Sequence, residues 1–114
     1  MPTERLLLVA PPTDLARSLA FALGAEGYEV TVRDTPPSRA WLTANRFDCT
    51  VADQRVFTGE TYEAIAFCIK AHPVVLIAAH PHPWLIDWVA ETVDLPLAEG
   101  AVTSAVRRAT HIEA

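Results

Sequence analysis

Apolar residues along this chain follow two patterns. One is a short continuous run, as in residues 6–9 and 74–78, and such runs are typical of strands that are covered on both faces. The other is a repeat at helical spacing, which occurs between the runs. Together with one alternating segment, the runs predict strands at 5–10, 28–32, 47–53, 73–78 and 93–97.

Helices are expected between these strands. Thr13 or Asp14 can cap the first helix, and Gly27 offers the left-handed turn that ends a helix. The expected helices are 13–24, a segment from Pro36 through Leu42, 60–71, 84–91 and 99–111. The residues expected to face the core are Leu15, Leu19, Ala22 and Leu23 in the first helix and Ala64, Ile65, Cys68 and Ile69 in the third.

Strands and helices therefore alternate five times, with short connections. This alternation predicts a parallel sheet with helices on both faces, which is an α/β fold. The 114 residues suit one domain spanning 1–114, with a single core region.

Charge and composition narrow the possible functions. The net charge of −5 repels nucleic-acid phosphates, so nucleic-acid binding is not expected. The apolar runs are too short to span a bilayer, and the N-terminus lacks the pattern of a signal peptide. Cys49 and Cys68 are widely spaced, which predicts buried free thiols in a cytoplasmic protein rather than a disulfide or zinc site.

The segment 47–53 ends in an acid, Asp53. In open α/β sheets, ligands bind beyond the carboxyl ends of the strands. Asp53 is therefore either a chemical centre or a structural acid. In the second case it would accept hydrogen bonds from loop N–H groups or pair with Arg55.

Three segments carry a resemblance to a known family. They are Ala25-Glu26-Gly27-Tyr28-Glu29-Val30, then Arg46-Phe47-Asp48 followed by Asp53, and Ser104-Ala105-Val106-Arg107-Arg108-Ala109. In this order and spacing the chain resembles a response-regulator receiver domain of the CheY-like family. The resemblance implies a flavodoxin-like, five-stranded parallel sheet of order 2-1-3-4-5, with a fourth helix that is short here.

In that family the aspartate matched by Asp53 accepts a phosphoryl group, and the resemblance implies which neighbours should assist it. The two acids that hold Mg²⁺ after the first strand match Ala10 and Pro11. The Ser or Thr that ends the fourth strand matches Ala78, and the Lys that ends the fifth strand matches Leu97. None of these replacements carries a charge or a hydroxyl group, so the charge stabilisation that phosphoryl transfer needs is missing.

The favoured hypothesis is a pseudo-receiver of two-component or phosphorelay signalling. Such a domain binds a protein partner, which is a kinase, an effector domain or another signalling protein, without phosphorylation, and it is not an enzyme. The alternative is a receiver that a histidine kinase phosphorylates on Asp53 through a non-standard pocket.

Two further hypotheses rank lower. His80, His82 and Asp53 offer metal-ligating groups, but the His-Pro-His-Pro loop is rigid and need not bring the two rings together. We therefore expect no metal and no cofactor. A nucleotide or flavin enzyme would need a glycine-rich loop after the first strand, where Pro11-Pro12 stands instead.

If phosphate chemistry is gone, the function must rest on a contact surface. The resemblance implies the fourth helix, fifth strand and fifth helix, which would bind a partner or a second copy. Trp84, Leu85 and Trp88 on the short fourth helix cannot all be buried on one face, so at least one Trp should be exposed. Phe21 on the first helix points outward, where it either extends the patch as a second aromatic or is an ordinary exposed residue.

Overall fold

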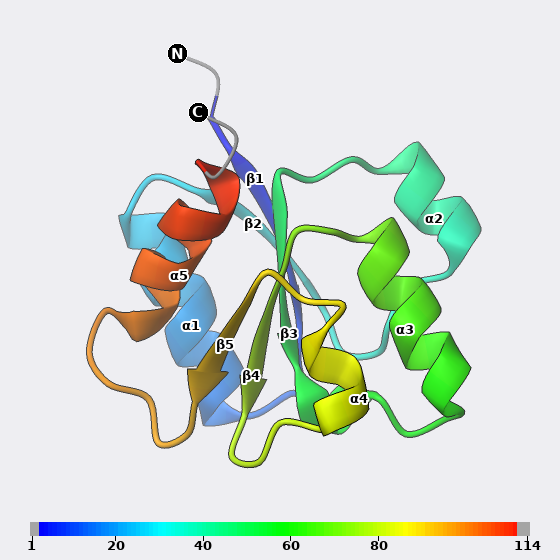
Figure 1. The fold of residues 1–114 in the computed structure, drawn as a ribbon. Coiled ribbons are helices and arrows are strands. Elements are labelled where there is room, and N and C mark those ends of the chain that lie inside the picture. Colours follow the sequence, from blue (N-terminus) through cyan, green and yellow to red (C-terminus); the bar gives the residue numbers. More distant parts are fainter. Residues whose placement is uncertain (1–2, 112–114) are drawn as a thin grey trace.

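The computed structural model describes residues 3–111, and these form a five-stranded parallel sheet flanked by helices (Figure 1). The strand order is β2-β1-β3-β4-β5, which confirms the predicted topology. The strands are β1 Arg5–Val9, β2 Glu29–Arg33, β3 Cys49–Asp53, β4 Val74–Ala78 and β5 Glu91–Asp94. The helices are α1 Asp14–Ala25, α2 Arg39–Ala44, α3 Thr61–Lys70, α4 Pro83–Ile86 and α5 Ala101–Thr110, with a 3₁₀ turn η1 at Gln54–Val56. The outermost residues of the predicted 1–114 domain lie outside the described part.

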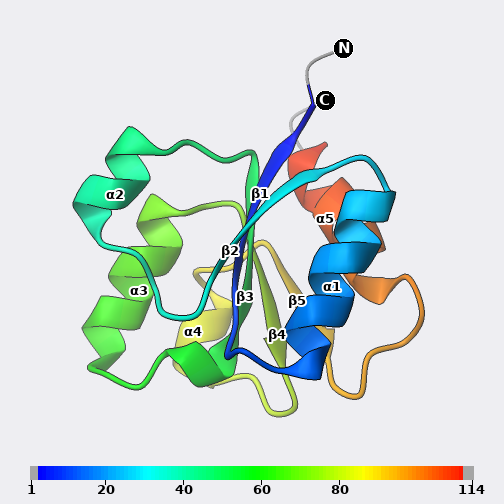
Figure 2. The same cartoon turned by 180° about the vertical axis from the view of Figure 1, so that it is seen from behind.

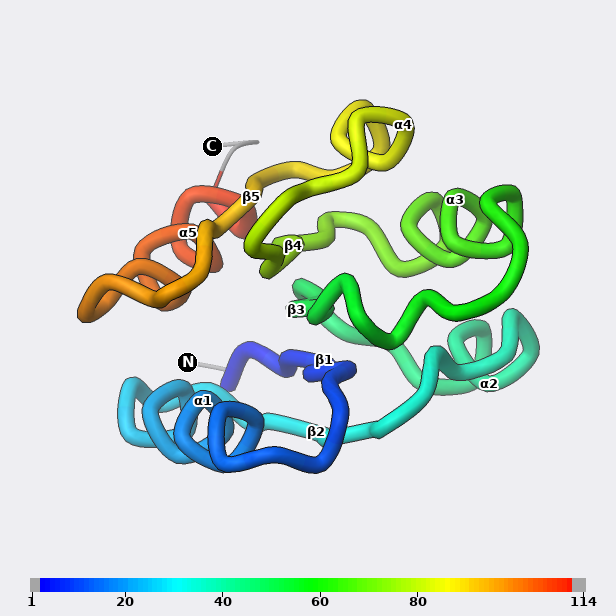
Figure 3. Tube along the Cα trace, turned by 90° about the horizontal axis from the view of Figure 1, so that it is seen from below, coloured from blue at the N-terminus to red at the C-terminus, as the bar shows by residue number. Residues whose placement is uncertain are grey.

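Helices cover both faces of the sheet, as expected. Figure 3 shows α1 and α5 on one face and α2, α3 and α4 on the other. One core layer lies under α1 and α5 and includes Leu8, Leu23 and Val106. The second lies under α2, α3 and α4 and includes Phe67 and Leu85. Alternate residues of each central strand point into opposite layers, which is why β1 and β4 contain continuous apolar runs and every residue of β3 is buried.

The ends of α1 follow the predicted signals. The Thr13 hydroxyl accepts a hydrogen bond from the Ala16 N–H and caps the helix. Gly27 takes φ 98° as the chain turns toward β2.

The buried face of α1 differs from the prediction at one residue. Ala22 was expected to face the core but is exposed. Ala16 takes its place in the buried stripe with Leu19 and Leu23.

The inner face of α3 also differs from the prediction. Ala64 and Cys68 are buried as expected, but Ile69 is 52% exposed and Phe67 is buried instead. Burying the larger aromatic ring removes more apolar area from water, so α3 is rotated to favour Phe67 over Ile69.

The segment between β4 and α5 departs most from the sequence-based boundaries. The predicted helix 84–91 is only the single turn Pro83–Ile86, and the predicted strand 93–97 is Glu91–Asp94. The Ala90 N–H already donates to the Val74 carbonyl oxygen, so the chain enters the sheet earlier than expected. Pro96 has no N–H with which to continue the strand. Within residues 3–111, no helix is long and apolar enough to cross a membrane.

Candidate functional site at the end of β3

Asp53 is the last residue of β3 and lies at the carboxyl edge of the sheet. Its strand lies between β1 and β4, and only 2% of the residue is exposed. A buried carboxylate needs hydrogen-bond donors or a cation close by, because burial otherwise disfavours its charged form.

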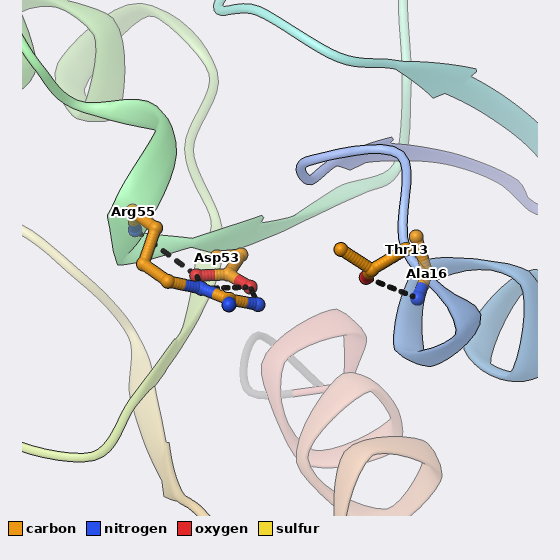
Figure 4. Close-up of polar contacts among 4 residues, drawn as sticks. All are labelled: Thr13, Ala16, Asp53 and Arg55. Atoms are coloured by element: carbon orange, nitrogen blue, oxygen red, sulfur yellow. Dashed lines mark hydrogen bonds and ion pairs between the residues drawn. The ribbon is translucent and has the colours of Figure 1, made fainter.

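Arg55 supplies both the donors and the cation (Figure 4). The η1 turn brings the Arg55 backbone N–H within 3.0 Å of Asp53 Oδ1. The guanidinium group donates from Nε to Oδ1 at 3.1 Å and from Nη2 to Oδ2 at 2.7 Å. Contact with the Asp53 carboxylate raises the pKa of Arg55 above its usual value. Asp53 therefore makes both contacts considered for a structural acid, since it accepts a loop N–H and pairs with Arg55.

This arrangement leaves both carboxylate oxygens occupied. An Arg that binds a carboxylate through two nitrogens forms one of the strongest side-chain contacts. The Arg55 side chain is 56% exposed while that of Asp53 is 3% exposed, so the guanidinium group lies between the acid and the solvent. Among the described residues, no buried side-chain nitrogen or oxygen lacks a hydrogen-bond partner.

A cavity of about 830 Å³ opens beside this pair. Its lining comes from the start of α1, the end of β3, the end of β4 and the residues after β5. Ala78 lines it as expected. Ala10 and Pro11 do not: Ala10 is buried and donates its N–H to the Arg33 carbonyl oxygen, and the Pro11 carbonyl oxygen accepts from the Thr13 N–H.

The expected position of Leu97 must be corrected. Because β5 ends at Asp94, opposite Ala78, Leu97 lies beyond the strand and packs against the core layer under α1 and α5. Leu95 lines the cavity instead, and Pro96 follows it in the sequence. Leu95, like Leu97, carries no charge.

Gln54, which follows β3, forms hydrogen bonds to the loop that carries His80 and His82. The Gln54 side chain donates to the His80 carbonyl oxygen at 3.0 Å and accepts from the His82 N–H at 2.9 Å. Sequence reasoning did not single out Gln54, and its place directly after Asp53 was the available signal. The His82 ring stacks on Trp84, with centroids 5.0 Å apart.

The metal site that was considered would combine His80, His82 and Asp53. Both histidines line the cavity with Asp53. Within residues 3–111, however, no group of three or more His, Cys, Asp or Glu side chains is placed to hold a metal ion. Arg55 fills the space next to the one carboxylate that such a site would need.

The surface expected around α4 is present in part. Trp84 is 38% exposed and Trp88 is 45% exposed, so both rings reach solvent as the helix pattern suggested. Ile86, which the sequence analysis did not assign to the surface, is exposed beside them. Leu85 must be removed from this surface, because it is fully buried in the core layer under α2, α3 and α4.

Phe21 is 81% exposed, so its outward direction is confirmed. It cannot extend the Trp surface, however, because α1 covers the opposite face of the sheet from α4 (Figure 2). The two exposed aromatic sites are therefore separate.

Several solved structures with the same arrangement are response regulators or receiver domains. The chemotaxis protein CheY4 of Vibrio cholerae matches with a TM-score of 0.77 and 17% identity, over 95% of this chain and 99% of CheY4. The HemR receiver domain of Leptospira biflexa matches with a TM-score of 0.74 and 20% identity, over 96% and 95% of the two chains. The receiver domain of the sensor histidine kinase PA1611 from Pseudomonas aeruginosa, with magnesium in its active-site cleft, matches with a TM-score of 0.75 and 16% identity, over 96% and 98%.

No protein-family model and no curated protein matches the sequence. The likeness therefore rests on the backbone, whose five strands, strand order and helix layers agree over nearly the whole chain. The chain has the flavodoxin-like fold of the response-regulator receiver domains.

Proposed function

We propose that this chain is a pseudo-receiver, a two-component signalling module that binds a protein partner without being phosphorylated. The observation that carries the proposal is the contact between Asp53 and Arg55. It leaves the acid 2% exposed and gives each of its oxygens a guanidinium donor.

Phosphorylation of Asp53 requires one carboxylate oxygen to attack phosphorus from an open direction. The incoming phosphoryl group also carries negative oxygens that need cations and hydrogen-bond donors. Ala78 and Leu95 line the cavity where such groups would have to stand. An attack would have to displace Arg55 first, which would leave a buried carboxylate without its cation.

The alternative, a receiver phosphorylated on Asp53 through a non-standard pocket, would use Arg55 as the missing cation. Arg55 is bound to the attacking group and not held at a distance from it. A cation in that place stabilises the carboxylate before the reaction and makes it a poorer nucleophile, so it favours the resting state.

For the partner-binding surface we propose Trp84, Ile86 and Trp88. Exposed tryptophans bring a large apolar area to an interface at small entropic cost. Of the ionisable groups nearby, Asp87 is acidic and exposed, Glu91 pairs with Arg108, and the His82 ring stacks on Trp84. Two copies meeting here would oppose like charges, so we propose a different protein with basic groups at its rim, in place of the homodimer that this surface also suggested.

The cellular compartment is part of the same proposal. Cys49 and Cys68 are both free and buried. Free thiols without a disulfide framework suit a reducing compartment, and a module that meets kinases or effectors of two-component signalling would act in the cytoplasm.

The test uses a phosphoryl analogue, beryllofluoride, together with Mg²⁺. We expect the amide resonances of Asp53, Arg55 and Ala78 to stay unchanged when both are added, because Arg55 occupies the site. Saturable shifts at these amides that vanish in Asp53→Asn would overturn the proposal in favour of a phosphorylated receiver.

A further inference from the structure

Helix α3 carries an exposed stripe on the side away from the core. Tyr62 is 68% exposed and Ile69 is 52% exposed, and Glu63, Ala66 and Lys70 are exposed between and beside them. These five residues recur at spacings of three, four and seven, so they share one face of the helix. A large aromatic and a large aliphatic side chain on this face are left in contact with water.

The short helix α2 does not cover this exposed face of α3. It has only six residues, against ten in α3, and the two lie side by side in Figure 1. Between them runs a groove of about 750 Å³. Its walls include Leu42 of α2, Phe67 of α3 and the Pro36-Pro37 segment. The stripe and the groove form one continuous surface, because Tyr62 and Lys70 also line the groove.

The stripe is divided into an apolar side and a charged side. At 3.6 residues per turn, Tyr62 and Ile69 fall on one side of Ala66, and Glu63 and Lys70 fall on the other. Within residues 3–111, neither Glu63 nor Lys70 forms an ion pair. Both charges are therefore available to a partner.

This pattern is complementary to itself. A two-fold axis across α3 at Ala66 makes two copies of the helix antiparallel and keeps like sides together. Tyr62 then meets Ile69 of the second copy on the apolar side. On the charged side, Glu63 meets Lys70 of the second copy. Each contact occurs twice, and the small side chain of Ala66 allows a close approach at the crossing.

The orientation of Glu63 fits this arrangement. Its carboxylate reaches back toward the start of α3, since a Cβ added to Gly59 would lie 2.7 Å from Glu63 Oε2. In the antiparallel pair, Lys70 near the end of the second α3 lies beside the start of the first α3, toward which the Glu63 carboxylate points.

We propose that α3 is the interface through which two copies of this chain form an isologous dimer. The interface is one helical stripe and the groove wall beside it, which places it at the small end of specific interfaces. The dimer is therefore in exchange with monomer and depends on concentration. The proposal is independent of the pseudo-receiver function, which concerns Asp53 and the α4 surface.

Sedimentation equilibrium tests the proposal over roughly 10 µM to 1 mM, the range in which interfaces of this size associate. The wild-type chain should pass from monomer to dimer. Lys70→Glu and Glu63→Lys should each weaken the dimer about tenfold or more, because each variant replaces two attractive contacts with two repulsive ones. Circular dichroism should show that both variants stay folded.

A mixture of the two variants gives the sharpest readout. Combining Lys70→Glu with Glu63→Lys in equal amounts restores opposite charges at both contacts, so the mixture should dimerise when neither variant does alone. Trp88→Glu serves as the matched control on the α4 surface and should leave the dimer intact.

Three results would overturn the proposal. One is a wild-type chain that stays monomeric over the whole concentration range. This result counts against the dimer even if Lys70→Glu weakens binding to a different protein. Another is a dimer that neither charge reversal weakens. The third is a mixture that associates no better than its separate components.

Discussion

At the scale of single residues, the pair Asp53 and Arg55 decides what the carboxyl edge of the sheet can do. The acid is the last residue of β3, and its oxygens are bound by a side chain two residues further along. Under the proposed function, Arg55 of the chain itself supplies the cation, and the two residues form a structural ion pair in place of a reaction centre.

Removing the guanidinium group should therefore destabilise the fold. We expect Arg55→Ala to lower the free energy of unfolding by about 1–2 kcal/mol, a figure reduced for the solvent exposure of Arg55. Urea denaturation measures this loss. Arg55→Lys should lie between wild type and Arg55→Ala, because an ammonium group cannot bind both oxygens in the same way. Equal stability of all three proteins would show that the pair is not structural.

The sequence indicated part of this site and missed part of it. Asp53, Arg55 and Ala78 could be named because they stand at strand ends or next to one. Leu95 was missed because the end of β5 depends on pairing with β4, which the local pattern of residues 93–97 does not show. The position of Gln54 directly after Asp53 marked it as a residue of the site, but its contact with the distant loop at His80 depends on the folded chain.

At the scale of elements, the single turn of α4 both packs into the core and presents exposed side chains. Leu85 packs into the core. Trp84 and Ile86 of the same turn are exposed, as is Trp88 just after it. Sequence periodicity predicted the order and type of the elements from β1 to α5. It overestimated the length of α4, because Pro83 starts the turn and the chain must join β5 by Glu91.

Leu85 of α4 and Trp88, which follows α4, should respond differently to mutation. Leu85→Ala should lower the free energy of unfolding by about 2–4 kcal/mol, because it removes a fully buried side chain. Trp88→Glu should change stability by less than about 0.5 kcal/mol and weaken partner binding instead. Thermal unfolding, together with binding to the partner by calorimetry, separates the two effects. Unchanged partner binding by a folded Trp88→Glu variant would contradict the assigned surface.

At the scale of the whole molecule, the sheet separates two core layers, and each contains one thiol. Cys49 lies in the layer under α1 and α5, and Cys68 lies in the layer under α2, α3 and α4. Burial raises the pKa of Cys49 to about 12 and that of Cys68 to about 11. Both cores therefore hold their thiols in the neutral form.

Alkaline solution should consequently destabilise the fold. In the unfolded chain thiols titrate near pH 8.5, so between about pH 9 and 11 the unfolded state loses protons that the folded state keeps. Stability is then full below this window and falls as pH rises, by about 1–2 kcal/mol per thiol at pH 10. Urea midpoints at neutral and alkaline pH measure the loss, which should be smaller in Cys49→Ala and Cys68→Ala. An equal loss in wild type and both variants would show that the thiols do not cause it.

The most direct test of the pseudo-receiver function is intact-mass spectrometry after incubation with acetyl phosphate and Mg²⁺. A receiver known to accept phosphate from this donor serves as the positive control. We predict no phosphoryl adduct on the wild-type chain, because Arg55 holds both oxygens of Asp53 and the positions matched to the metal ligands and the hydroxyl, Ala10, Pro11 and Ala78, carry no carboxylate or hydroxyl group. A stoichiometric adduct on wild type that is absent from Asp53→Asn would contradict this account.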